Sequence, residues 1–252
     1  GAELPLFTSC CPAWVQFCEK SHPELLAHVS TCRSPMEMFA AVIKEQEKTS
    51  SRKQFHVAVM PCTAKKFEAA RDEFCVDGLP NVDAVITTQE LIRMIKESGV
   101  VFEDLEPEAL DMPFGVTSGA GVIFGVTGGV TEAVLRRLAS DKSRGGLYAS
   151  ALTGVRGMKG VKEASVPYLD REVRIAIVSG LANAEALIQK IVSGEEHYDF
   201  VEVMACPGGC VSGAGQRYSS SGAKAERGEG LYAVDRVSSI KRSEENSLVQ
   251  AL

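Results

Sequence analysis

Three short motifs contain five of the eight cysteines in this chain of 252 residues. They read TSCCPAW at 8–14, MPCTAKKFE at 60–68 and EVMACPGGC at 202–210. Proline, glycine and small residues favour tight turns that can present thiolates to one metal centre. A set of four thiolates, the usual ligand count of a 4Fe–4S cluster, is available at Cys11, Cys62, Cys206 and Cys210.

The neighbours Cys10 and Cys11 cannot both bind one cluster at normal geometry, because adjacent side chains diverge. One ligand and one thiol outside the ligand set is the simplest interpretation. Cys10 beside a metal cluster therefore suggests chemistry rather than scaffolding.

Other uses of the cysteines fit less well. Zinc sites favour pairs of CxxC knuckles, which the chain lacks. A disulfide-stapled secreted domain is disfavoured by the size of the chain and by the clustering of its cysteines. Cys18, Cys32 and Cys75 have no motif partner and are read as buried thiols. The histidines are scattered, with no metal-binding spacing, and are read as structural or surface groups.

In the second motif, Lys65 and Glu68 follow Cys62 at three and six residues. If a helix begins at the cysteine, the three side chains lie near one face, and Lys65 places a donor beside an anionic ligand. The alternative is an ordinary surface lysine with Glu68 as its partner. Spacing alone favours neither.

Short apolar runs alternate with helical patterns along the chain. Strands are predicted at 56–60, 84–87, 173–178 and 199–204, and helices at 89–97 and 183–192. Such alternation indicates an α/β fold with mainly parallel sheet flanked by helices. Because sites in these sheets form at the carboxyl ends of strands, the positions of Cys62 and Cys206 directly after strands agree with a site there.

The glycine-rich segment 114–134 leads into a helix through Arg137. It lacks the strand, GxGxxG and acidic residue of a dinucleotide site, so close backbone packing is the favoured interpretation. The polar segments 140–146 and 219–230 show no periodicity and are predicted to be loops.

Composition excludes some classes of function. The net charge of −6 disfavours a nucleic-acid partner, and no apolar run is long enough to span a membrane. The start of the chain shows no secretion signal, so a reducing, cytoplasmic location is expected. The abrupt ends suggest a fragment of a longer protein.

The three motifs closely resemble, in order, the signature motifs of the iron–iron (FeFe) hydrogenases. The resemblance extends to SGAGVIFGVTGG, VRGMKG and GLANAEALI, and so covers nearly the whole chain. It implies a single H-cluster domain over residues 1–252, with two lobes of mainly parallel sheet, 1–112 and 113–252, and the metal cluster between them.

The resemblance also implies a cofactor and residue roles. The H-cluster is a 4Fe–4S cubane joined to a two-iron subsite that carries CO, CN⁻ and an azadithiolate bridge. Cys11, Cys62, Cys206 and Cys210 would hold the cubane, with Cys210 bridging to the subsite. Cys10 would pass protons to the bridging amine, Lys65 would donate to a cyanide, and Ser30 would relay protons outward. Apolar packing around the subsite would come from Met60, Met204 and Phe124. Glu68 would be structural.

This chain departs from the family pattern at two places. Residues 213–217 read GAGQR where the family typically has GGGQP, and Met36 stands where many members have glutamine. The expected activity is 2H⁺ + 2e⁻ ⇌ H₂. The expected electron partner is ferredoxin, an NAD-linked system, or an iron–sulfur or flavin subunit or domain. Maturation proteins are expected to load the two-iron subsite. The alternatives are a hydrogen sensor with slow turnover and a cubane-only relative of iron–sulfur assembly, which should lack the thiol of Cys10 and the amine of Lys65.

Overall fold

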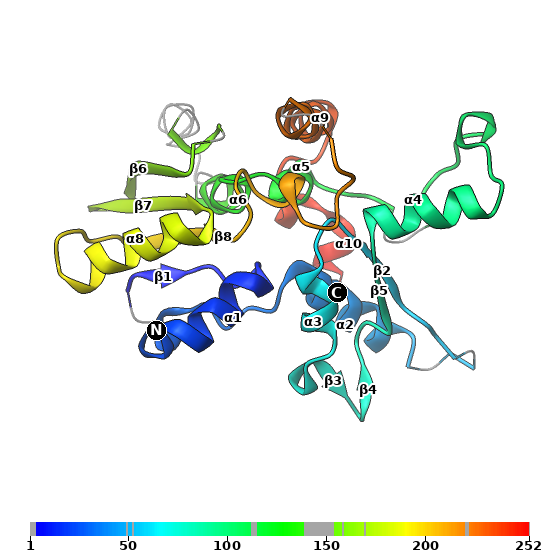
Figure 1. Cartoon of the computed structure of the whole chain (residues 1–252), viewed down its shortest axis with the longest axis horizontal. Coiled ribbons are helices and arrows are strands. Elements are labelled where there is room, and N and C mark those ends of the chain that lie inside the picture. The colour runs from blue at the N-terminus through cyan, green and yellow to red at the C-terminus, as the bar shows by residue number, and fades with distance from the viewer. Residues whose placement is uncertain are drawn as a thin grey trace. The chain divides into compact units, whose positions relative to one another are not determined.

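The computed structural model describes residues 4–48, 50–51, 53–111, 115–138, 154–157, 159–168, 170–219 and 222–251. These residues belong to two compact units, each assembled from segments that are separated in sequence. The first unit comprises 1–7, 106–212 and 219–252, and the second comprises 8–105 and 213–218. Figure 1 shows their elements.

The first unit is built on a four-stranded sheet in the order β1-β8-β7-β6. Its strands are β1 (Leu6–Phe7), β6 (Val161–Tyr168), β7 (Arg171–Ser179) and β8 (Phe200–Met204). β8 runs parallel to both β1 and β7, whereas β6 and β7 form an antiparallel hairpin. The central part of the sheet is mostly apolar and is buried on both faces, as parallel strands covered by helices are.

Helices cover this sheet. Leu135 of α6 (Gly129–Leu138) packs against Ile175 and Ile177 of β7. α8 (Leu181–Val192) also packs on β7, as Figure 1 shows, and buries Ala184, Leu187 and Ile188. The remaining helical elements of this unit are α5 (Gly119–Val122), η4 (Ile123–Gly125), η5 (Cys210–Ser212), α9 (Ala223–Val237), η6 (Ser243–Glu245) and α10 (Ser247–Gln250).

The second unit contains a smaller, two-stranded parallel sheet. It pairs β2 (Val57–Met60) with β5 (Ala84–Thr87), so that Met60 lies opposite Thr87. One face of this sheet packs on α2 (Pro35–Gln46) through Met36 and Ala40. The other elements are α1 (Pro12–Ser21), η1 (Pro23–His28), α3 (Ala64–Ala69), η2 (Asp72–Phe74), the hairpin β3 (Cys75–Val76) and β4 (Leu79–Pro80), α4 (Thr88–Glu97) and η3 (Phe102–Asp104).

The strand and helix predictions are confirmed to within two residues at each end, and so is the α/β fold class. The hairpin strand β6 is not predicted from the sequence. Its more buried positions include the charged Lys162 as well as small and apolar residues, which hides the alternating apolar pattern of a strand.

The prediction of a loop over 219–230 is wrong, because α9 begins at Ala223. This helix lacks an apolar stripe. Its packed face combines Gly228, where an added Cβ would lie 3.3 Å from Val126, and the buried Asp235 with Leu231 and Tyr232, which pack against the core cluster of Val126 and Val211. The other predicted loop, 140–146, lies outside the described residues. None of the helices in the described part of the chain is long and apolar enough to cross a membrane.

Candidate metal centre

The first cysteine motif forms a turn at the start of α1. Cys11 is the N-cap of this helix, in extended conformation, and Pro12 takes the first helical position, where its missing N–H is not needed. The fully buried Trp14 donates its indole N–H to the carbonyl of Thr8, 3.0 Å away. This bond closes the turn across both cysteines, which remain partly exposed to solvent.

The second motif leaves β2 at Met60, and α3 begins two residues after Cys62. The segment that follows the third motif packs here: Gly215 donates its N–H to the carbonyl of Pro61 at 3.0 Å. A Cβ at Gly215 would lie 3.0 Å from the amide nitrogen of Cys62 and 2.8 Å from Thr87. Only glycine therefore fits against the backbone of this cysteine without displacement.

Lys65 is buried, so the alternative of a solvated surface lysine does not hold. Its ammonium lies 2.7 Å from Oε2 of Glu68 and 3.4 Å from the carbonyl oxygen of Cys10. These contacts confirm that Lys65 and Glu68 are partners, and they place the ammonium beside the first cysteine turn. An ammonium has three N–H donors, so one remains for an anionic ligand.

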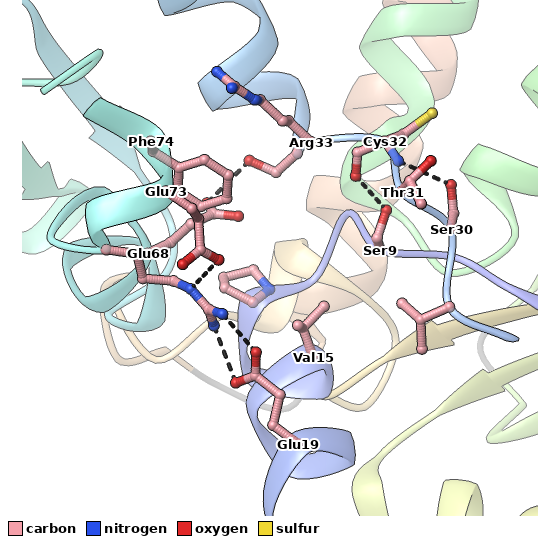
Figure 2. Close-up of a pocket in the computed structure, with 14 residues that line it drawn as sticks. Ser9, Val15, Glu19, Ser30, Thr31, Cys32, Arg33, Glu68, Glu73 and Phe74 are labelled. Carbon is pink, nitrogen blue, oxygen red and sulfur yellow. Dashed lines mark hydrogen bonds and ion pairs between the residues drawn. The ribbon is translucent and has the colours of Figure 1, made fainter. Parts of the chain in front are cut away.

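A cavity of about 350 Å³ lies beside the same turn, within the second unit. Figure 2 shows Ser9, Ser30 and Cys32 on one side of it and Glu68, Glu73 and Phe74 on the other. Arg71 donates to Glu73 at 2.7 Å and to both carboxylate oxygens of Glu19. Carboxylates and hydroxyls that line a cavity large enough to hold water can exchange protons with solvent.

Ser30 lies in this cavity, where its hydroxyl oxygen accepts the N–H of Cys32 at 3.2 Å. The neighbouring carbonyl of Cys32 accepts the hydroxyl of Ser9 at 2.6 Å. Since Ser9 directly precedes Cys10, these bonds tie the 30–32 segment to the first cysteine turn. The structure thus brings Ser30, Cys10 and Lys65 to neighbouring parts of one unit.

The third motif forms a tight turn after β8. Gly208 and Gly209 both have positive φ, 87° and 96°, which side-chain-bearing residues rarely adopt. The N–H of Gly209 returns to the carbonyl of Cys206 at 3.0 Å. Cys206 and Cys210, both partly exposed, therefore lie at the two ends of one tight turn.

The three predicted packing residues have different surroundings. Met60 is half-buried and packs on the core of the second unit with Met36 and Val85. Met204 is buried at the end of β8, and Phe124 lies half-buried in η4. Met36 itself is a core residue of the small sheet.

The predicted ligands are divided between the two units. Cys11 and Cys62 belong to the second unit, and Cys206 and Cys210 belong to the first. Within the described residues, no group of three or more acidic, cysteine or histidine side chains is gathered to hold a metal ion. The four-cysteine set thus stays a prediction from sequence.

Two charged residues were not expected from the sequence to matter for the site: Glu202, the first residue of the third motif, and Lys162 of β6. Both side chains are buried in the first unit. A usable signal existed for the first of them: a glutamate in DFVEVM, a strand expected to be buried on both faces, must find hydrogen-bond donors inside the protein.

These folds and turns define an α/β protein with cysteine motifs of the iron–sulfur type. The family model described as the C-terminal domain of the iron-only hydrogenase large subunit matches residues 1–214. The chain belongs to this family.

The relatives include enzymes and an assembly component. The chain is 43% identical to the NADP-reducing hydrogenase subunit HndD of Solidesulfovibrio fructosivorans, over 99% of this chain and 43% of that protein. It is 35% identical to cytosolic iron-sulfur assembly component 3 of Rattus norvegicus, over 96% of this chain and 52% of that protein. The chain thus spans about half the length of these curated relatives.

A solved structure agrees with the fold. A variant of FeFe hydrogenase HydA1 from Chlamydomonas reinhardtii superposes with a TM-score of 0.80 at 39% identity, covering 100% of this chain and 71% of that one.

Proposed function

We propose that this chain is the H-cluster domain of an FeFe hydrogenase and interconverts protons, electrons and H₂. The observation that carries the proposal is the buried Lys65, whose ammonium is held beside the turn of Cys10 and Cys11 with one donor left over. A cubane needs cysteines alone, whereas a cationic donor and an additional thiol suit a cluster that also binds anionic ligands and exchanges protons.

The residues present fit such a cluster. Four thiolates, from Cys11, Cys62, Cys206 and Cys210, would hold the cubane, and Gly209, between the last pair, brings no side chain to the backbone of Thr127. Gly215 likewise brings no side chain to the backbone of Cys62. When bound, the H-cluster would supply the redox chemistry of 2H⁺ + 2e⁻ ⇌ H₂.

The protein's own groups would position the cluster and move protons. Lys65 would donate to an anionic cyanide while Glu68 fixes the ammonium from the other side. Cys10 would give up and regain a proton at Sγ. Ser30 and the carboxylates of the adjacent cavity would carry that proton to and from solvent. Met60, Met204 and Phe124 would supply apolar surface that excludes water.

Electrons would come from a redox partner, an iron–sulfur or flavin subunit or domain. The relation to HndD, a subunit of an NADP-reducing hydrogenase, supports a multi-subunit setting.

A second candidate is a cubane-only protein of iron–sulfur assembly. The 35% identity to cytosolic iron-sulfur assembly component 3 favours it. Such a protein would need the four cysteine ligands but neither the Cys10 thiol nor the Lys65 ammonium as a hydrogen-bond donor to cyanide.

The test is the infrared spectrum of the anaerobically matured chain in the CO and CN⁻ stretching region. Sharp bands are expected. Absorbance of a 4Fe–4S cluster without these bands, after maturation that loads a known hydrogenase in parallel, would favour the assembly function.

The ligand assignment has its own matched pair of variants. Cys75, expected from the sequence to be buried, is exposed, as is Cys32. Cys62→Ala is expected to lose the cubane, whereas Cys75→Ala, which changes a cysteine outside the proposed set, is expected to keep it. Full iron content in Cys62→Ala, measured against the unaltered chain, would refute Cys62 as a ligand.

A further inference from the structure

We propose that Glu202 and Lys162 are positioning residues that hold the Cys206–Cys210 turn in its ligand-bearing conformation by fixing the 127–128 loop on which the turn rests. Neither residue would touch the cluster. The proposal rests on the proposed function in one respect only, namely that Cys206 and Cys210 are ligands.

Glu202 accepts hydrogen bonds from the start of α6. Its side chain is fully buried in the middle of β8. One carboxylate oxygen accepts the N–H of Gly128 at 2.6 Å, and the other accepts the N–H and the hydroxyl of Thr131 at 2.7 and 2.8 Å. The amide of Gly128 directly precedes α6 and that of Thr131 lies in its first turn, where the helix offers no acceptor for it, so the carboxylate acts as a cap from a distant strand.

Lys162 holds the same loop by its carbonyls. Its buried ammonium donates to the carbonyl oxygens of Thr127 and Gly157, each at 3.0 Å, and also to that of Val155. Burial is the larger of two opposing effects on Lys162 and lowers its pKa to about 8, although the negative charge of Glu202 partly offsets this decrease. The 127–128 loop is therefore fixed by two buried charged groups: Lys162 donates to the carbonyl of Thr127, and Glu202 accepts the N–H of Gly128.

The loop in turn carries the cysteine turn. Thr127 donates its N–H to the carbonyl of Gly208 at 3.1 Å. A Cβ at Gly209 would lie 2.5 Å from the amide nitrogen of Thr127, so the two backbones are in direct contact. On its other side, Gly208 donates its N–H to the hydroxyl of Ser179 at 3.2 Å. The peptide midway between Cys206 and Cys210 is thus held between the loop and β7.

The consequence is a specific dependence. If the loop moves, the acceptor contact of Gly208 with Thr127 is lost, and the distance between the two thiolates is no longer set. Buried charges are costly to retain, and here they serve the position of one loop rather than the interior of the sheet.

The experiment compares hydrogen exchange of the Thr127 and Gly208 amides in the metal-free full chain. Glu202→Gln keeps the shape of the side chain but turns an N–H donor toward Gly128 or Thr131. Loss of a buried charged acceptor is expected to speed exchange at both amides by about tenfold or more. Lys162→Met should act on the same amides, and the double variant should change them by less than the product of the two effects.

The matched control is Asp235→Asn, which breaks another buried ion pair of the same unit. Asp235 lies 2.7 Å from Arg136, toward the other end of α6. It should lower the thermal midpoint without changing exchange at Gly208. If Glu202→Gln does not fold, Thr131→Val removes only the hydroxyl donor and should give an intermediate effect. The proposal would be overturned if the Thr127 and Gly208 amides exchanged at the same rate in Glu202→Gln as in the Asp235→Asn control. The same holds for Thr131→Val where that variant replaces Glu202→Gln.

A second readout uses the reconstituted 4Fe–4S cluster. Glu202→Gln is expected to shift the electron paramagnetic resonance signal and midpoint potential of the cluster, and Asp235→Asn to leave both unchanged. An unaltered signal in Glu202→Gln would also count against the positioning role. A chain that binds no cluster at all would sink the ligand assignment, while the amide exchange would still report whether the turn depends on Glu202.

Discussion

One oxygen of Glu68 joins two elements of the second unit: Oε2 lies 2.7 Å from the ammonium of Lys65 on the same helix and 2.9 Å from the hydroxyl of Ser34. Ser34 is the N-cap of α2, and its hydroxyl oxygen accepts the N–H of Glu37 in the first turn of that helix. The same hydroxyl donates to Glu68, so it links α2 to α3. Because both charges are buried, each is stabilised chiefly by the other.

The first prediction concerns this pair. Glu68→Gln should lower the free energy of unfolding by about 2 kcal/mol, because the buried ammonium loses its counter-charge but keeps a hydrogen-bond acceptor. Urea unfolding of the metal-free chain measures the change. Adding Lys65→Met should recover part of the loss, since no buried charge is then left alone; strictly additive losses would contradict the coupling.

Lys66 provides the control for that experiment. It is next in sequence but exposed, and its partner Glu90 is exposed as well. Exposed ion pairs are screened by solvent, so Lys66→Gln should change stability far less than Glu68→Gln does.

The second prediction tests the proton role of Cys10. Cys10→Ser should retain the cluster and lose nearly all H₂ production, because a serine hydroxyl is too weak an acid to replace a thiol. Hydrogen evolution and iron content would be measured on the same sample, with Cys75→Ser as the control. Activity of Cys10→Ser equal to that of the control would rule out this residue as the proton carrier.

The third prediction compares two glycines of the first unit, both with positive φ. At Gly209 an added Cβ would meet backbone atoms of Thr127 and Val126 at 2.5 and 2.8 Å, whereas at Gly194 nothing lies within 4 Å. Gly194→Ala should therefore cost only the backbone strain, about 1 kcal/mol. Gly209→Ala should cost distinctly more and should also reduce iron binding. Thermal unfolding and iron analysis test both, and equal costs would mean that the close contact is unimportant.

The fourth prediction concerns pH. Hydrogen bonds from Lys66 and from the backbone and hydroxyl of Thr87 lower the pKa of Glu90 from 4.5 to about 2. Between these values the unfolded chain binds a proton at Glu90 that the folded chain does not, so stability from this group is present above pH 4.5 and is lost as pH falls towards 2.

The matching variant isolates that effect from other carboxylates. Glu90→Gln should be less stable than the unaltered chain at pH 6, and the difference in thermal midpoint should shrink towards zero as the pH approaches 2. Glu90 belongs to the capping box of α4, so loss of helical signal should accompany the transition. A difference that stays constant with pH would show that the charge of Glu90 does not stabilise this cap.

Local patterns sufficed for much of the fold. AVIT at 84–87 and QELIRMIKE at 89–97 have the periods of a strand and a helix, and both elements form there. The pattern failed at 223–237, because the packed face of α9 mixes a glycine and a buried aspartate with Leu231 and Tyr232 and so shows no continuous apolar stripe. That choice depends on Val126 and Arg136, which are distant in sequence.

The sequence by itself determined the family and the candidate thiolates, because motif chemistry is local: a cysteine, its neighbours and their spacing are readable without coordinates. Only the tertiary structure decided which groups support those motifs. The burial of Lys65, its bond to Glu68, and the hold of Glu202 and Lys162 on the 127–128 loop all join residues from different elements. A buried charge must find its partner wherever the fold brings one, and that partner has no fixed place in the sequence.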